Sequence, residues 1–213
     1  MRLMATITAA LVSTSVLVWG AEPGADEERY WPQWRGPQAT GVSSTATPPV
    51  EWSEGQNVRW KVETPGWGNS TPVVWGDRLY LTTAVPTGES VPADSVPPPA
   101  RAGGFRHPQV SSATDVLRFV VLAIERATGD LAWERSVGEG LPHEGRHEFG
   151  SFASPSPVTD GERVYVSFGS QGLYALDLEK QVLWEKDLGD MTIKLDFGED
   201  SSPTLHEEKL LLA

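Results

Sequence analysis

Residues 143–147 are His-Glu-Gly-Arg-His and match the H-E-x-x-H pattern, whose residue types could bind zinc and activate water. In that chemistry the two histidines bind the metal and the glutamate acts as a general base. Both histidines must point at one ion, and a spacing of four residues achieves this on a helix. The pattern therefore raises the hypothesis of a zinc-dependent hydrolase, which depends on the structure of this segment.

The residues around this segment argue against a helix. Pro142 precedes it, Gly145 lies inside it and Gly150 follows it, and glycine in a helix interior costs about 1 kcal/mol relative to alanine. In an extended chain the residues at positions i and i+4 stand about 13 Å apart, which is too far to share a metal ion. We therefore expect a polar loop without metal, and the zinc hydrolase stays as an alternative that zinc analysis would test.

The composition describes an acidic chain that must fold by packing alone. Its 213 residues carry a formal net charge of −12 and include no cysteine. Because no basic stripe is present, we expect no nucleic-acid partner. Without cysteine the chain has no disulfide, no thiolate metal site and no cysteine nucleophile. Nine tryptophans, 21 glycines and 17 prolines favour many short strands joined by turns over a helical bundle.

The N-terminus has the features of an export signal. Arg2 gives it a positive start, residues 5–19 are uncharged and mostly apolar, and the small residues Gly20 and Ala21 follow. This pattern predicts a signal peptide over residues 1–20, since the apolar run is short for a membrane span. We expect an exported protein, periplasmic or extracellular, with no membrane span after cleavage. Residues 21–56 then form a lead-in segment.

A repeat organises the rest of the chain. Three segments contain a proline, a short apolar strand, a polar turn and an alternating strand, and they cover residues 70–81, 156–166 and 202–211. Gly76 and Gly161 fall where the first two segments need a tight turn. A second hairpin follows each of these two and carries a tryptophan, Trp133 or Trp184. The prolines of the second and third segments lie 46 residues apart, which is the period of a four-stranded propeller blade.

We predict an all-β fold, an incomplete β-propeller of four-stranded antiparallel blades. Residues 57–213 would hold about two and a half blades, whereas a closed propeller needs at least four. Residues 57–62 match a fourth strand and would form an N-terminal clasp whose partner blade lies outside this sequence. Residues 85–113 are a Pro/Gly/Ser-rich insertion between the second and third strands of the first blade, expected to be mobile or extended and not packed. In the second blade the strands are expected at residues 157–159, 163–168, 172–178 and 181–187.

Residues 156–189 and 123–134 resemble the repeat of propellers of the pyrroloquinoline-quinone (PQQ) type. The start, residues 30–43, resembles that of exported bacterial propeller proteins that carry this repeat. The resemblance implies the fold, but the family includes quinone-dependent alcohol dehydrogenases, the propeller lipoprotein of outer-membrane assembly and uncharacterised scaffolds. The dehydrogenases share a vicinal cysteine pair and a calcium or lanthanide held by Glu, Asn and Asp. This chain has no cysteine for that pair or for a lipid anchor, and no recognisable ligand pattern.

We therefore expect an exported, non-enzymatic scaffold or binding module that presents its inter-blade loops to a protein or a small molecule, without a cofactor. The alternative is a PQQ-dependent oxidoreductase that would use PQQ with calcium. Functional loops usually lie on rigid scaffolds, and residues 143–147 connect the two predicted blades. We hypothesise that His143, Arg146 and His147 line a pocket at the mouth of the central channel, and we assign no catalytic residue.

Overall fold

The computed structural model of the chain describes residues 29–96, 108–193 and 197–213. These residues form antiparallel strands and two short 3-10 turns, η1 (Ala93–Ser95) and η2 (Gly169–Gln171). The expected signal peptide lies outside the described residues. Within the described ranges, no helix has the length and apolar character needed to cross a membrane.

The first sheet corresponds to the first expected blade, and its antiparallel strands lie in the order β1-β2-β4-β5. The strands are β1 (Val73–Trp75), β2 (Arg78–Ser90), β4 (Asp115–Glu125) and β5 (Leu131–Gly140). Apolar residues on both faces of β4 are buried, from Phe119 to Ile124, so this sheet is covered on both sides. Gly129 joins β4 to β5 with φ +82°, a left-handed conformation that glycine adopts without a steric cost.

The second sheet confirms the second expected blade to within two residues at each strand end. It contains β7 (Val158–Thr159), β8 (Arg163–Ser167), β9 (Leu173–Asp177) and β10 (Val182–Lys186), in the order β7-β8-β9-β10. The third repeat forms the hairpin of β11 (Thr204–His206) and β12 (Lys209–Leu211). The described sheets do not close into a ring, as expected for an incomplete propeller.

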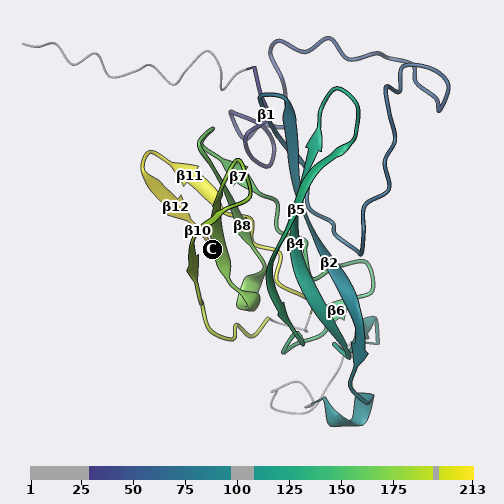
Figure 1. Ribbon diagram of the computed structural model, residues 1–213, viewed down its shortest axis with the longest axis vertical. Helices are drawn as coiled ribbons and strands as arrows, with labels where there is room; N and C mark the ends of the chain where they lie inside the picture. Colours follow the sequence, from purple (N-terminus) through teal and green to yellow (C-terminus); the bar gives the residue numbers. More distant parts are fainter. Residues whose placement is uncertain (1–28, 97–107, 194–196) are drawn as a thin grey trace, which may run out of the picture.

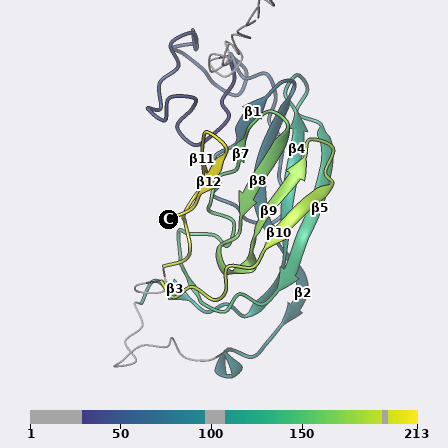
Figure 2. The same cartoon turned by 90° about the vertical axis from the view of Figure 1, so that its left-hand side faces the viewer.

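The sheets stack face to face in sequence order (Figures 1 and 2). The largest core lies between the first two sheets, where Phe119 and Val121 of β4 meet Val166 of β8. Neighbouring residues of a strand point to opposite faces, so Tyr165 and Ala175 pack on the other side of the second sheet. There they meet Leu205 and Leu210 of the third hairpin. The second sheet therefore buries one apolar face against each of its two neighbours.

The repeated tryptophans make the same contact between consecutive units. Trp133 of β5 donates a hydrogen bond from Nε1 to the carbonyl oxygen of Leu178, in the turn between β9 and β10, at 3.0 Å. Trp60 donates in the same way to the carbonyl of Arg126, at 3.0 Å, and Arg126 occupies in the β4–β5 turn the repeat position of Leu178. Trp184, the next tryptophan in the series, is 40% exposed.

The residues before the repeated prolines form a second link between the units. The backbone N–H of Thr71 donates to the hydroxyl of Ser156 at 2.9 Å, and the N–H of Ser156 donates to the hydroxyl of Ser202 at 2.9 Å. Each of the three residues stands directly before a proline. The three repeats are therefore connected in series by hydroxyl groups at equivalent positions.

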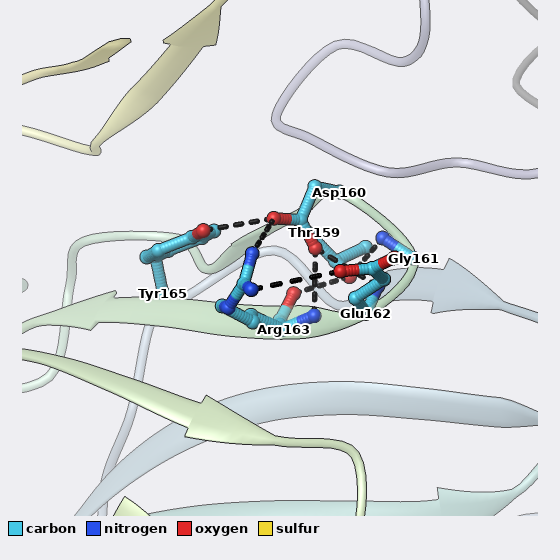
Figure 3. A network of polar contacts seen from close by, with 6 residues as sticks. All are labelled: Thr159, Asp160, Gly161, Glu162, Arg163 and Tyr165. Carbon is cyan, nitrogen blue, oxygen red and sulfur yellow. Dashed lines mark hydrogen bonds and ion pairs between the residues drawn. The ribbon is translucent and has the colours of Figure 1, made fainter. Parts of the chain in front are cut away.

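A polar network stabilises the turn between β7 and β8 (Figure 3). The carboxylate of Asp160 accepts hydrogen bonds from the backbone N–H of Arg163 at 2.6 Å and from the hydroxyl of Tyr165 at 2.8 Å. Burial, followed by the hydrogen bond to Asp160, raises the pKa of Tyr165 above its ordinary value. Gly161 lies in this turn with φ +89°. It packs closely against the Trp75 ring of the first sheet. The turn is thus fixed from both sheets.

Two expectations concern the connecting segments. Residues 57–62, expected as a clasp for a blade outside this sequence, pair with none of the described strands, and Trp60 makes the inter-unit contact described above. The expectation that residues 85–113 are not packed is wrong at both ends of this insertion. Its start extends β2 along β4, and Val110 is buried near its end, in β3 (Val110–Ser111). Extended segments become ordered strands when a neighbour supplies hydrogen bonds, and here β4 and β6 (Arg146–His147) supply them.

Candidate functional site

The segment 143–147 is a loop that ends in a strand. Arg146 and His147 form β6, which pairs with β3 of the insertion. His143 Nε2 lies 2.9 Å from the carbonyl oxygen of Met191, and the Glu144 carboxylate accepts a hydrogen bond from the backbone N–H of Ile193 at 3.1 Å. The backbone is thus not the helix that a zinc protease of this pattern requires. In the described part of the chain, no three His, Cys, Asp or Glu side chains gather where they could hold a metal ion.

The structure places the three expected site residues at three different cavities. His147 lines a cavity of about 820 Å³. His143 lines a cavity of about 20 Å³ between the blades, and Arg146 lines one of about 340 Å³ beside the insertion. The three residues share a loop but do not converge on one space. We name the first space the inner cavity and the third the arginine cavity.

The inner cavity lies where the three repeats begin. Asn69, Ser154 and Asp200 line it, and each stands three residues before a repeated proline. The lead-in contributes Trp34 and Arg35 to the same lining. The lead-in is held against both blades: Trp31 forms a β-bridge with Val74, and the carbonyl of Pro32 accepts a hydrogen bond from Thr159 at 2.9 Å. Chain segments far apart in the sequence therefore form one lining.

Aromatic rings and hydrogen bonds order the wall of the inner cavity near His147. The His147 ring packs against Phe149 and Phe197, with ring centroids 5.4 Å and 5.0 Å apart. Asn69 donates from Nδ2 to the carbonyl of Phe149 at 2.7 Å, which holds the loop to the first sheet. The Phe149 ring itself is 73% exposed. An exposed ring on an anchored backbone suits contact with a ligand, because little backbone ordering is needed on binding.

The chemistry of the inner cavity favours ligand binding over catalysis by a serine nucleophile. Its lining combines aromatic faces, amide and hydroxyl groups, a cation at Arg35 and a carboxylate at Asp200. Ser154 donates its hydroxyl to the Ser151 carbonyl at 3.0 Å, so this hydrogen bond does not go to a histidine as nucleophilic catalysis would require. Cavities of this size with a few placed polar groups are typical of ligand sites.

Sequence reasoning identified one residue of this lining, His147, and missed the others. A signal for part of them was present: Asn69, Ser154 and Asp200 are equivalent positions of the repeat, and equivalent positions in adjacent blades lie side by side. No such signal marks Trp34 or Arg35, because the lead-in is outside the repeat. Their place depends on backbone contacts with β1 and β7.

The structure has stacked four-stranded antiparallel sheets that recurring tryptophan contacts join. This arrangement is typical of one class, the β-propeller repeat proteins of the PQQ type. A family model described as outer membrane protein assembly factor BamB matches residues 42–200, about three quarters of the chain. The chain therefore belongs to this family of PQQ-repeat domains. No curated protein matches it in sequence.

Proposed function

We propose that this chain belongs to an exported, non-enzymatic β-propeller scaffold that binds a protein or a small molecule at the inner cavity. The observation that carries the proposal is the cavity of about 820 Å³, whose lining comes from the lead-in and from all three repeats. The family description, an outer-membrane assembly factor, agrees with a binding role. The apolar N-terminal run after Arg2 supports export to the periplasm or beyond.

The residues of this chain do not fit the quinone site of the related dehydrogenases. The chain contains no cysteine for the pair that covers the quinone. The described residues offer no group of three acidic or histidine side chains for the accompanying cation. We therefore derive no oxidation step, and the proposal assigns binding to the aromatic and polar lining of the inner cavity.

Site-specific photocrosslinking tests both parts of the proposal. The photoreactive amino acid p-benzoylphenylalanine replaces Phe149 at the inner cavity or, as a matched control, Trp52, an aromatic residue of the lead-in that is 71% exposed and outside the cavity lining. Both variants are made in the source cells, which are irradiated and fractionated. We expect the protein outside the cytoplasmic fraction, with a light-dependent adduct at position 149 that mass spectrometry identifies and that is absent at position 52.

Two results would contradict the proposal separately. Protein retained in the cytoplasmic fraction would refute export. Identical adducts at positions 149 and 52, or none at position 149, would refute binding at the inner cavity. In the adduct-forming strain, Asn69→Ala should reduce the adduct, because Asn69 holds the Phe149 backbone in place.

A further inference from the structure

Arg146 contacts two aromatic rings with its guanidinium group. Its guanidinium carbon stands 4.7 Å from the centroid of the Trp67 ring and 5.6 Å from that of Phe152. Trp67 precedes β1 and Phe152 precedes β7, so the arginine joins the inner edges of the two blades. Cation–π contacts of this kind orient a guanidinium and remove it partly from water.

This cation is not neutralised by the described part of the protein. Its hydrogen bonds use Nη1 alone, which donates to the carbonyls of Gly150 at 2.9 Å, His147 at 3.2 Å and Glu148 at 3.5 Å. Among the described residues no carboxylate forms an ion pair with it. Burial alone lowers the pKa of Arg146, which is the effect of desolvation without a compensating negative charge. The donors on Nε and Nη2 are not used by the loop contacts.

Arg146 lines the arginine cavity, whose walls are of two kinds. Pro86 and Leu117 supply apolar surface beside the two rings, and Ser112 and Thr114 supply hydroxyl-bearing residues. The one acidic residue of the lining, Asp115, is exposed. At about 340 Å³, the space has the size of a small-molecule site, and its walls combine apolar surface with hydroxyl groups and the Arg146 cation.

We propose that the arginine cavity binds a small organic carboxylate with an aromatic or branched aliphatic body. Arg146 would bind the carboxylate through its planar fork, and Trp67, Phe152 and Leu117 would enclose the apolar body. A carboxylate fits this fork in a bidentate manner. The site is separate from the inner cavity, and its chemistry does not depend on the binding role proposed there.

Calorimetric titration of the full 213-residue chain with phenylacetate tests this proposal. We expect saturable binding that is at least tenfold weaker for phenylacetamide, which has the same body without the charge, because charge-assisted hydrogen bonds are about twice as strong as neutral ones. Acetate, which lacks the apolar body, should bind at least tenfold more weakly as well. Phenyl phosphate separates the two anion classes. It should bind more weakly than phenylacetate, because its tetrahedral phosphate group is bulkier than a planar carboxylate in a cavity of about 340 Å³.

Three variants test whether phenylacetate binds in the arginine cavity. Arg146→Gln should weaken phenylacetate binding at least tenfold, and Ser112→Phe should abolish it by filling the cavity while leaving the carbonyl contacts of Arg146 in place. Arg135→Gln is the matched control, since Arg135 is an exposed arginine of β5, and it should leave binding unchanged. If Arg146→Gln fails to fold, as judged by circular dichroism, Ser112→Phe alone decides.

Four results would overturn the proposal. They are the absence of saturable phenylacetate binding, equal affinity for phenylacetamide, phenyl phosphate binding as tight as that of phenylacetate, and binding that persists in the folded Ser112→Phe protein. The third result would show that the site does not select a carboxylate, and each of the other three would show that Arg146 does not hold a carboxylate in this cavity.

Discussion

Replacing Trp133 with alanine is expected to lower the free energy of unfolding by about 3–5 kcal/mol, the range for deleting a large buried aromatic side chain. Trp133 is only 7% exposed, and its ring packs 5.9 Å from that of Tyr80. The substitution leaves a cavity between the first two sheets. It also removes the donor to the Leu178 carbonyl, so the contact that joins the blades is lost with the packing.

Trp184→Ala is the matched control, because it removes the same residue type from the same repeat position. Trp184 is 40% exposed, so its loss should cost less, about 1–2 kcal/mol, the scale of its remaining burial and of its ring contact with Tyr165. Urea denaturation followed by far-ultraviolet circular dichroism measures both variants. Equal losses would show that Trp133 is not an inter-blade anchor in solution.

Gly161→Ala should have the second-largest effect, a loss of about 2–5 kcal/mol in the free energy of unfolding. Gly161 has φ +89°, and a Cβ atom there would lie 2.3 Å from the Trp75 ring. The left-handed backbone costs a residue with a side chain about 1–2 kcal/mol, and crowding a packed site adds about 1–3 kcal/mol. Trp75 packs against Tyr30 and the core between the first two sheets, so it cannot move without disturbing both.

Gly76→Ala separates the cost of the left-handed backbone from the cost of crowding the Trp75 ring. Gly76 holds the equivalent turn of the first repeat with φ +59°, and a Cβ atom there would meet nothing within 4 Å. Only the backbone cost of about 1–2 kcal/mol should appear. Thermal unfolding of the two variants measures the difference, and a Gly161→Ala protein as stable as the Gly76→Ala protein would contradict the contact between Trp75 and the second blade.

The strands could be predicted from sequence because their signals are local. Alternating apolar residues and turn glycines lie within ten residues of each other, and they placed all strands of the second sheet. The β9–β10 turn shows that residue type alone does not predict every turn position. Lys180 adopts φ +72° there, in a hairpin that lacks the glycine found at Gly129. The Asp177 carboxylate accepts hydrogen bonds from Glu179 and Gln181 and stabilises this turn.

The site could be predicted only in part, because its geometry depends on contacts between distant segments. The segment 143–147 was correctly expected to be a loop, but the pairing of β6 with the insertion turns Arg146 toward Trp67 and His147 toward Phe197. Residues 110–111 pair with residues 146–147. Because each of these strands has only two residues, the sequence shows no periodic pattern that would predict them. The clasp was expected to pair with a blade outside this sequence, and residues 57–62 accordingly have no strand partner among the described residues.

The stacking of the repeats as blades, on which both cavities depend, can be tested most directly by disulfide trapping. The chain has no cysteine of its own, so a pair introduced by Ser156→Cys and Ser202→Cys has no competing thiol. The Ser202 hydroxyl lies 2.9 Å from the backbone nitrogen of Ser156, which keeps the two Cα atoms within about 7 Å of each other, inside the reach of a disulfide. Mild oxidation should therefore join this pair within one chain once the side chain at position 156 turns away from Thr71. The pair of Ser156→Cys and Ser95→Cys, with Ser95 in η1 beyond the far end of β2 (Figure 1), should keep free thiols. Mass spectrometry would show the predicted link between positions 156 and 202, whereas free thiols in both proteins, or equal linking in both, would contradict the stacked arrangement.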